Sequence, residues 1–261
     1  MRNPHLADDP LENLGRFSIP SRISIRLPVT SVVFESRPEM MARISRIVQW
    51  HRRWFQFDRD IIVSPYNPEI PHTTWVNCGP LPPAPNFRMW YSDLCVHGFD
   101  SLCVGSSHLL VWQWDGFIIN PNLWTNNFLN WDYIGAPHGD FWRRVSVWLA
   151  QMRQGWENPF LTERSLSGNG GFSLRSKRYL QSSNSLDRSG FTVQDEDLYL
   201  CVERRKEMIE KGVRFCPADI AASFSVDHEY HHSSFGFHSE TQLGKVKRYL
   251  EGVYLPREET T

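Results

Sequence analysis

A strand, a helix and a second strand follow one another within residues 28–65, and this order limits the fold more than any other feature of the chain. The run 28–36, PVTSVVFES, is rich in the β-branched residues that strands favour. Residues 37–54 carry apolar side chains at helical spacing, and Pro38 suits a first helical position. The run 59–65, RDIIVSP, is expected to form the second strand. Because strands joined by a crossover helix lie parallel, the sequence predicts an α/β fold with a mostly parallel central sheet flanked by helices.

Asp115 follows an apolar run that is expected to be a further strand of this sheet. The run ends in Trp112, and Gln113, Trp114, Asp115 and Gly116 come next. An ionised carboxylate is costly in apolar surroundings unless a partner compensates it. Open parallel sheets bind ligands beyond the carboxyl ends of their strands, so Asp115 is a candidate ligand-binding residue. The alternative is a turn residue whose carboxylate accepts backbone hydrogen bonds.

The remaining chain predicts five further segments. Glycine-rich residues 168–180 indicate a tight turn, a short strand and a helix, and glycines at such a turn would let a ligand lie against backbone amides. The other segments are expected to be a loop over 66–88, a helix over 89–107, a short helix near 141–153 and a helix over 194–215.

Composition bounds the setting of the protein. The chain of 261 residues is 41% hydrophobic, which suits one large domain, and carries a net charge of −1. No apolar run approaches the roughly 18 residues of a membrane span, and the first residues lack the apolar centre of a signal peptide. Five cysteines without CxxC spacing favour a reducing compartment over a disulfide framework. We therefore expect a cytoplasmic protein.

Four local clusters of basic residues allow two interpretations. They are either solvated helix faces or parts of a surface that meets phosphates. The clusters lie at 51–54, 175–178, 203–206 and 245–248.

Seven short motifs occur in a fixed order: VWQWDGFIINP, WDYIGAP, GNGGFSLRSKR, EDLYLC, GVRFCP, FSVDHEY and FGFH. Together, over about residues 28–243, they resemble an uncharacterised family of glycosyltransferase-like proteins from bacteria, phages and some eukaryotes. The resemblance implies a single GT-A-like domain over residues 28–261, with a Rossmann-like nucleotide-binding half. Residues 1–27 lie outside it, and we expect them to form a loosely packed N-terminal extension.

The resemblance also implies a donor site. The tripeptide Gln113-Trp114-Asp115 stands where GT-A enzymes usually carry an Asp-x-Asp that holds a divalent cation on the donor diphosphate. His238 in FGFH resembles the C-terminal histidine that completes such a site. Asp115 and His238 are therefore the expected ligands of Mg²⁺ or Mn²⁺. Further donor-binding residues are expected to be Gly168, Asn169, Gly170, Gly171 and Arg175, with Arg175 either meeting phosphate or pairing with an acid.

Catalysis requires a base for the acceptor hydroxyl. Glu196 and Asp197 begin the helix expected over 194–215 and are the candidates, with Asp197 preferred and Asp227 or Glu229 next. The alternative is that the acids only compensate the helix dipole.

The expected function is transfer of a sugar from a nucleotide-sugar donor, such as a UDP-sugar, to a hydroxyl acceptor. The acceptor would be a glycan or a hydroxymethylated base of phage DNA, in the host cytoplasm if a phage encodes the chain. Two other classes remain open: a non-catalytic nucleotide-sugar or carbohydrate-binding module, and a metal-dependent phosphoesterase.

Overall fold

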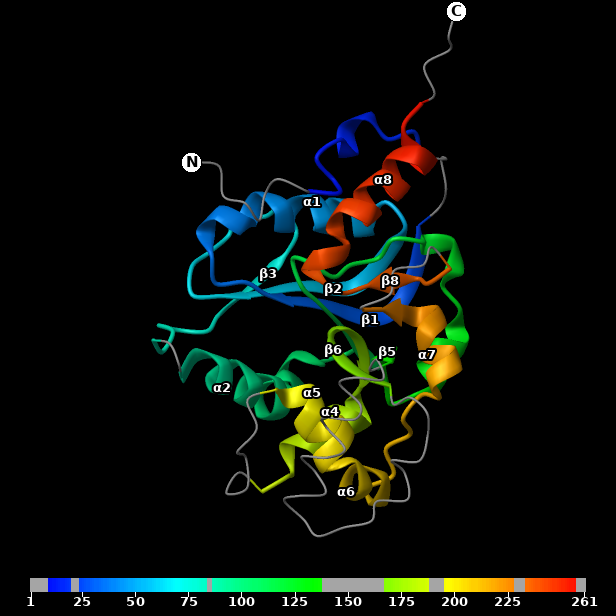
Figure 1. Ribbon diagram of the computed structural model, residues 1–261. Helices are drawn as coiled ribbons and strands as arrows, with labels where there is room; N and C mark the ends of the chain where they lie inside the picture. Colours follow the sequence, from blue (N-terminus) through cyan, green and yellow to red (C-terminus); the bar gives the residue numbers. More distant parts are fainter. Residues whose placement is uncertain are drawn as a thin grey trace, which may run out of the picture.

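The strand–helix–strand unit expected near the start of the chain forms the centre of the protein. The computed structural model describes residues 9–19, 24–83, 86–137, 167–187, 195–227 and 233–256. Strand β1 (Ile25–Phe34) continues through helix α1 (Met41–Arg52) into strand β2 (Phe55–Ser64), and β1 and β2 pair in parallel. The predicted parallel unit and the α/β class are confirmed (Figure 1).

Four more strands extend this unit into a six-stranded sheet of order β3-β2-β1-β4-β6-β5. Pairing is parallel from β3 to β4, whereas β6 runs antiparallel to both of its neighbours. The sheet is therefore mostly parallel, as expected. The additional strands are β3 (Thr74–Asn77), β4 (His108–Trp112), β5 (Tyr133–Pro137) and β6 (Ser167–Ser176).

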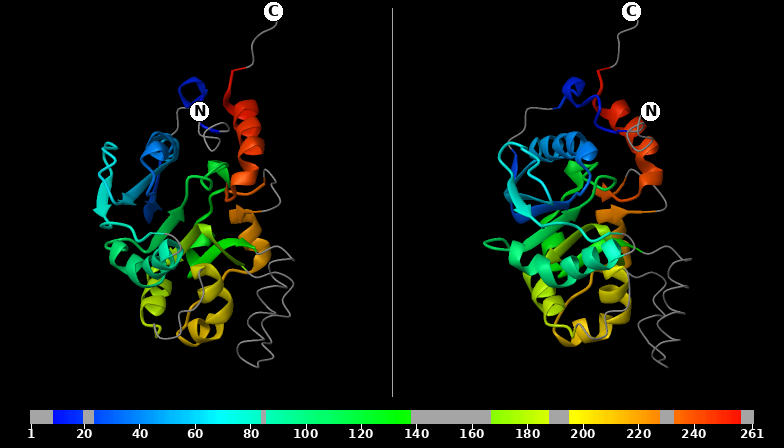
Figure 2. Two further views of the ribbon diagram at one scale, coloured as in Figure 1. Left: turned by 60° about the vertical axis from the view of Figure 1, so that its left-hand side comes forward. Right: turned by 90° about the vertical axis from the view of Figure 1, so that its left-hand side faces the viewer.

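Helices cover both faces of the sheet (Figures 1 and 2). Helix α1 and the last helix, α8 (Leu243–Tyr254), lie on one face. The opposite face carries α2 (Asn86–Asp93), α4 (Lys177–Asn184), α5 (Glu196–Leu198) and α6 (Arg205–Glu210). Helix α7 (Ala218–Phe224) leads into a separate pair of short parallel strands, β7 (Ser225–Val226) and β8 (Gly236–Phe237). Among the described residues, no helix is both long and apolar enough to cross a membrane.

Four segments differ from their predictions. The helix expected over 89–107 is α2 followed by a π-helical turn, Leu94–Gly98, and a 3-10 turn that ends at Leu102. The loop expected over 66–88 contains strand β3, so that prediction is wrong for this part of it. The glycine-rich turn expected at 168–171 is part of strand β6, because this backbone pairs with β5. The single helix expected over 194–215 is broken by a π-helical turn, Tyr199–Glu203, between α5 and α6. The short helix expected near 141–153 lies outside the described residues.

The start of the chain belongs to the core. A loosely packed extension was expected, yet Leu11, Leu14 and Phe17 are buried. The Phe17 ring packs against Trp50 of α1 and Tyr254 of α8. For the described residues 9–19, the expectation of loose packing is therefore wrong.

The strand order places one edge of the sheet in a special position. After β1 the chain builds outwards through β2 and β3, then returns to place β4 on the other side of β1. The carboxyl ends of β1 and β4 therefore lie side by side at a topological switch point, where open α/β sheets bind ligands. Because β6 runs the opposite way, its first residues lie at this same edge.

His51 at the end of α1 is expected to make the fold sensitive to acid. Its Nε2 accepts a hydrogen bond from the backbone N–H of Ile118 at 3.2 Å, and its ring contacts Trp112. Burial lowers the pKa of His51 to about 3, well below the ordinary value of about 6.5. Between these two pH values His51 therefore binds a proton in the unfolded chain but not in the folded protein. Stability should be lost as pH falls from about 6.5 towards 3, by up to about 1.4 kcal/mol per pH unit.

Urea unfolding at pH 7 and pH 5 checks this expectation. His51→Gln should weaken the loss at pH 5, whereas His72→Asn at an exposed turn should leave it unchanged. His108, whose pKa burial also lowers, contributes with the same sign in every variant. Equal pH dependence in wild type and His51→Gln would contradict the assignment.

Candidate functional site

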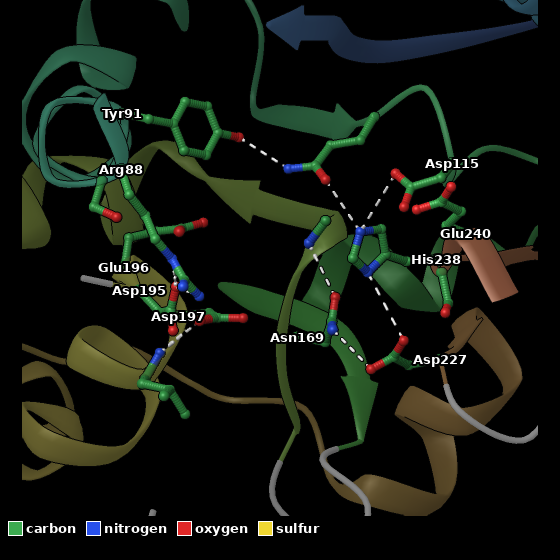
Figure 3. Close-up of a pocket in the computed structure, with 15 residues that line it drawn as sticks. Arg88, Tyr91, Asp115, Asn169, Asp195, Glu196, Asp197, Asp227, His238 and Glu240 are labelled. Atoms are coloured by element: carbon green, nitrogen blue, oxygen red, sulfur yellow. Dashed lines mark hydrogen bonds and ion pairs between the residues drawn. The ribbon is translucent and has the colours of Figure 1, made fainter. Parts of the chain in front are cut away.

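A cavity of about 500 Å³ opens at the edge where β1, β4 and β6 meet (Figure 3). One wall follows β4 and β8 and carries Asp115 and His238; the other follows α2 and α5. The lining residues are mostly polar: Arg88, Tyr91, Ser92, Gln113, Asp115, Asn169, Gly171, Asp195, Glu196, Asp197, Leu198, Asp227, His238, Ser239 and Glu240.

A tight turn presents Asp115 to this cavity. Gln113 and Gly116 exchange two backbone hydrogen bonds of 3.1 Å, so β4 ends before Asp115 rather than at it. A side chain at residue 116 would lie 2.9 Å from the Phe237 carbonyl oxygen, which explains the glycine. Asp115 is 9% exposed, and its Oδ1 accepts no hydrogen bond from the described residues. A buried carboxylate oxygen of this kind requires a cationic or hydrogen-bonding partner.

His238 lies beside that carboxylate. Its Nε2 lies 3.7 Å from Asp115 Oδ1 and 3.1 Å from the Oε1 atom of Gln113. On the other side of the ring, Nδ1 lies 3.9 Å from Asp227 Oδ1. A Cβ at Gly171 would lie only 2.2 Å from His238 Nε2. The histidine therefore occupies the space that the glycine leaves.

The geometry of Asp115 and His238 fits part of a cation shell. Their facing atoms border one space, and Mg²⁺ commonly takes one or two protein ligands together with waters and substrate oxygens. Binding through Nε2 would require Gln113 to give up its hydrogen bond. Among the described residues, no group of three or more His, Cys, Asp or Glu side chains could hold a metal by itself. His228, Glu229, His231 and His232 lie outside the described residues.

The opposite wall carries the two acids predicted to act in catalysis. Glu196 Oε1 accepts a hydrogen bond of 3.0 Å from Arg175 Nη2. Asp197 accepts two backbone hydrogen bonds, from Gly170 at 3.0 Å and from Leu198 at 2.8 Å. Burial is the main cause that raises the pKa of both carboxyl groups, and repulsion from Asp197 adds to it for Glu196. Both acids line the cavity, so the structure brings together the residues that sequence reasoning paired.

Arg175 lies behind this wall and does not line the cavity. Its side chain is 1% exposed, and it also bonds the Gly170 carbonyl oxygen at 3.2 Å. Of its two predicted roles, the structure shows the pairing with an acid, Glu196. Direct contact with a phosphate would require movement of this buried group.

The glycines of β6 make room for protein side chains. A Cβ at Gly170 would lie 2.6 Å from Glu196 Oε1, and the Gly168 carbonyl oxygen accepts a hydrogen bond from Tyr133. Asn169 lines the cavity, and its Nδ2 donates to Asp227 Oδ2 at 3.0 Å. The amides of Gly170 and Gly171 are already bonded to Asp197 and Asn169. Within the predicted 168–171 stretch, only Asn169 and Gly171 face the cavity.

A second cavity, of about 360 Å³, adjoins the first and shares Tyr91 and Gln113 with it. Of its lining residues the sequence predicted only Gln113 and Trp114, although the residues after β1 lie at the same sheet edge as the predicted Asp115. Trp114, a predicted donor-binding residue, lines this cavity instead of the first one. The lining residues are Phe34, Glu35, Ser36, Arg37, Phe87, Tyr91, Gln113 and Trp114.

Ser239 adopts a backbone conformation with φ 150° and ψ 129°, which non-glycine residues rarely adopt. Its N–H donates to the Asp115 carbonyl oxygen at 3.0 Å, so this contact joins the strained residue to the turn that carries Asp115. Strained residues of this kind cluster at functional sites.

Residues 94–238 match a protein family described as "Protein of unknown function (DUF5672)". This stretch is more than half of the 261-residue chain. The chain belongs to this family. The matched segment contains Asp115, Asp197 and Asp227 and ends at His238, whereas helix α2 of the second wall lies before it. None of the curated proteins compared with the chain matches it.

Gly171→Ala is expected to displace His238, because the new methyl group would occupy the place of the imidazole. Overpacking of this kind costs roughly 1–3 kcal/mol, which urea unfolding would measure. Gly252→Ala in α8 is the matched control, since a Cβ there meets nothing within 4 Å. The control should be neutral or stabilising by up to about 1 kcal/mol. Equal stability of the two variants would show that His238 is not fixed by Gly171.

Ser239→Gly is expected to stabilise the fold. Relief of the backbone strain gains roughly 1–3 kcal/mol, and the added freedom of the unfolded chain takes back about 0.4–1 kcal/mol. Ser185→Gly, at an ordinary φ of −83°, should only destabilise. Thermal unfolding of both variants decides the point, and a lower melting temperature for Ser239→Gly would exclude strain at this residue.

Proposed function

We propose that the protein is a glycosyltransferase with a GT-A-like fold that uses a nucleotide-sugar donor. The observation that carries the proposal is the pair of adjoining cavities at the switch point of the sheet. One is walled by aromatic rings and the other by carboxylates and His238. A nucleotide-sugar has matching parts: a flat base, a diphosphate and a polar sugar.

The nucleoside is proposed to occupy the second cavity. Phe34, Phe87 and Tyr91 form an aromatic cluster there, with Phe34 5.9 Å from Phe87 and 5.2 Å from Tyr91 between ring centroids. Trp114 supplies a further ring on the β4 side. Aromatic rings stack favourably on any nucleic-acid base. The glycosyl and diphosphate groups would then extend past Gln113 into the first cavity.

The diphosphate is proposed to bind with Mg²⁺ or Mn²⁺. Six of the residues lining the first cavity are acids, and Arg88, already paired with Asp195, and His238 are the basic ones. Such a wall would repel a diphosphate unless a cation came with it. Asp115 and His238 would hold the ion, which would neutralise the charge that develops on the leaving diphosphate.

Asp197 is proposed as the base. It would take the proton from the acceptor hydroxyl while the acceptor oxygen bonds to the anomeric carbon and the bond from that carbon to the donor phosphate breaks. A pKa raised by burial makes the carboxylate a stronger base near neutral pH. Arg175 holds Glu196 beside it. A neutral glycan is the first choice of acceptor. A hydroxymethylated base of DNA is the second choice, because the acids at the cavity would repel the DNA phosphates.

Asp115→Asn should abolish sugar release from a UDP-sugar, because the amide cannot balance the charge of a cation. Turnover of radiolabelled UDP-sugars with Mn²⁺, with and without glycan acceptors, measures this loss. Asp58→Asn, at an exposed site away from the cavity, should retain full activity. If wild type binds donors yet never turns them over, the non-catalytic binding module replaces the enzyme; if it cleaves simple phosphoesters instead, the phosphoesterase does.

Asp197→Asn should lower turnover by about 100-fold or more, whereas Glu196→Gln, which still accepts the Arg175 hydrogen bond, should retain most of it. Wild-type turnover should decrease as the pH is lowered. Because the pKa of Asp197 is raised, this decrease should begin at a higher pH than it would with an ordinary carboxylate. In Asp197→Asn one carboxylate oxygen that accepts a backbone N–H is replaced by an NH₂ group, which could destabilise the fold. The melting temperature and the affinity for UDP are therefore measured as controls. Normal turnover in both variants would place the base elsewhere, with Asp227 next.

A further inference from the structure

A fully buried arginine lies beneath Trp114, the tryptophan that lines the second cavity. Arg43 of α1 is 0% exposed, and its guanidinium carbon lies 5.2 Å from the centre of the Trp114 ring. Arg37 approaches the same ring at 4.9 Å and is itself bonded through two nitrogens to Glu35. Two guanidinium groups therefore contact one indole, within the distance at which a cation is attracted to an aromatic face.

Asp9, near the start of the chain, supplies an anion to this arginine. It is 3% exposed, and its Oδ1 lies 4.0 Å from Arg43 Nε while accepting the backbone N–H of Leu11 at 3.0 Å. Its Oδ2 accepts a hydrogen bond from Arg46 Nε at 2.7 Å. Asp9 thus connects the N-terminal segment, residues 9–19, to two consecutive turns of α1.

The charge of Arg43 requires such partners. An arginine without access to water is costly unless anions surround it. Asp9 has the largest electrostatic effect on Arg43 among these anions, and Asp115 and Glu240 act on it from the cavity side. A planar guanidinium against an indole also fixes the orientation of the ring, which a lysine ammonium would not do.

We propose that Asp9, acting through Arg43, positions Trp114 at the wall of the second cavity, so that the N-terminal segment is a working part of the donor site. Asp9 and Arg43 lie outside the matched family segment, whereas Trp114 lies inside it. Asp9 and Arg43 are positioning residues and touch no ligand. The effect on donor binding rests on the function proposed above, whereas the effect on Trp114 does not.

Fluorine NMR of the full chain labelled with 5-fluorotryptophan tests the positioning directly. The chain has eleven tryptophans, and Trp114→Phe identifies the resonance of Trp114 by its loss. Asp9→Asn keeps the hydrogen bond to Leu11 but removes the charge, and it should shift or broaden the Trp114 resonance. Asp9→Glu should restore the wild-type signal. Phe17→Leu alters the same segment at its contacts with Trp50 and Tyr254, and should leave Trp114 unchanged.

Binding of UDP with Mn²⁺ forms the second readout. Asp9→Asn and Arg43→Lys should raise the Kd for UDP by roughly fivefold or more, and Phe17→Leu should not. An unchanged Trp114 resonance in Asp9→Asn and Arg43→Lys would overturn the proposal. If Asp9→Asn does not fold, Arg43→Lys decides alone. If wild type binds no UDP, the proposed function fails, and the fluorine signal still decides whether Asp9 positions Trp114.

Discussion

The packing of the His238 ring against Gly171, with the Asp115 carboxylate beside it, holds the candidate site together. The turn that carries Asp115 and the segment that carries His238 are far apart in sequence. A hydrogen bond from the backbone N–H of Phe237 to the carbonyl oxygen of Phe117 aligns them. His238 then connects the β4 turn, through Gln113 and Tyr91, to helix α2. Small residues at 116 and 171 are a condition of this arrangement, since a Cβ at either position would meet the His238 wall. The donor site proposed here depends on that contact.

The central part of the fold could be predicted from sequence because its signals are local. The β-branched run before α1, the helical spacing within it and the apolar run after it specify a parallel unit, which the structure confirms. The pairing of Asp115 with His238 came from the family resemblance and not from spacing, and the structure brings the two side chains within 3.7 Å. The metal that they are proposed to hold stays a prediction.

The rest depends on contacts between distant segments. Glycines at 168–171 favour a turn locally, but pairing with β5 makes this stretch a strand, and Glu196 and His238 explain why residues 170 and 171 are small. Arg175 was expected either to meet phosphate or to pair with an acid, and its pairing with the buried Glu196 holds it behind the wall. The N-terminal segment shows no regular spacing of apolar residues. Three apolar side chains, Leu11, Leu14 and Phe17, are nevertheless enough to fix it against α1 and α8. No pattern within these segments indicates such partners.

The proposed function rests on one condition: the first cavity accepts a diphosphate only together with a cation held by Asp115 and His238. Calorimetric titration of UDP into the protein, with Mn²⁺ and again with excess EDTA, tests it most directly. We expect binding of one UDP per chain with Mn²⁺, a large loss of affinity in EDTA, and the same loss in Asp115→Asn with Mn²⁺ present. UDP binding that is equally tight in EDTA and in Asp115→Asn would contradict it.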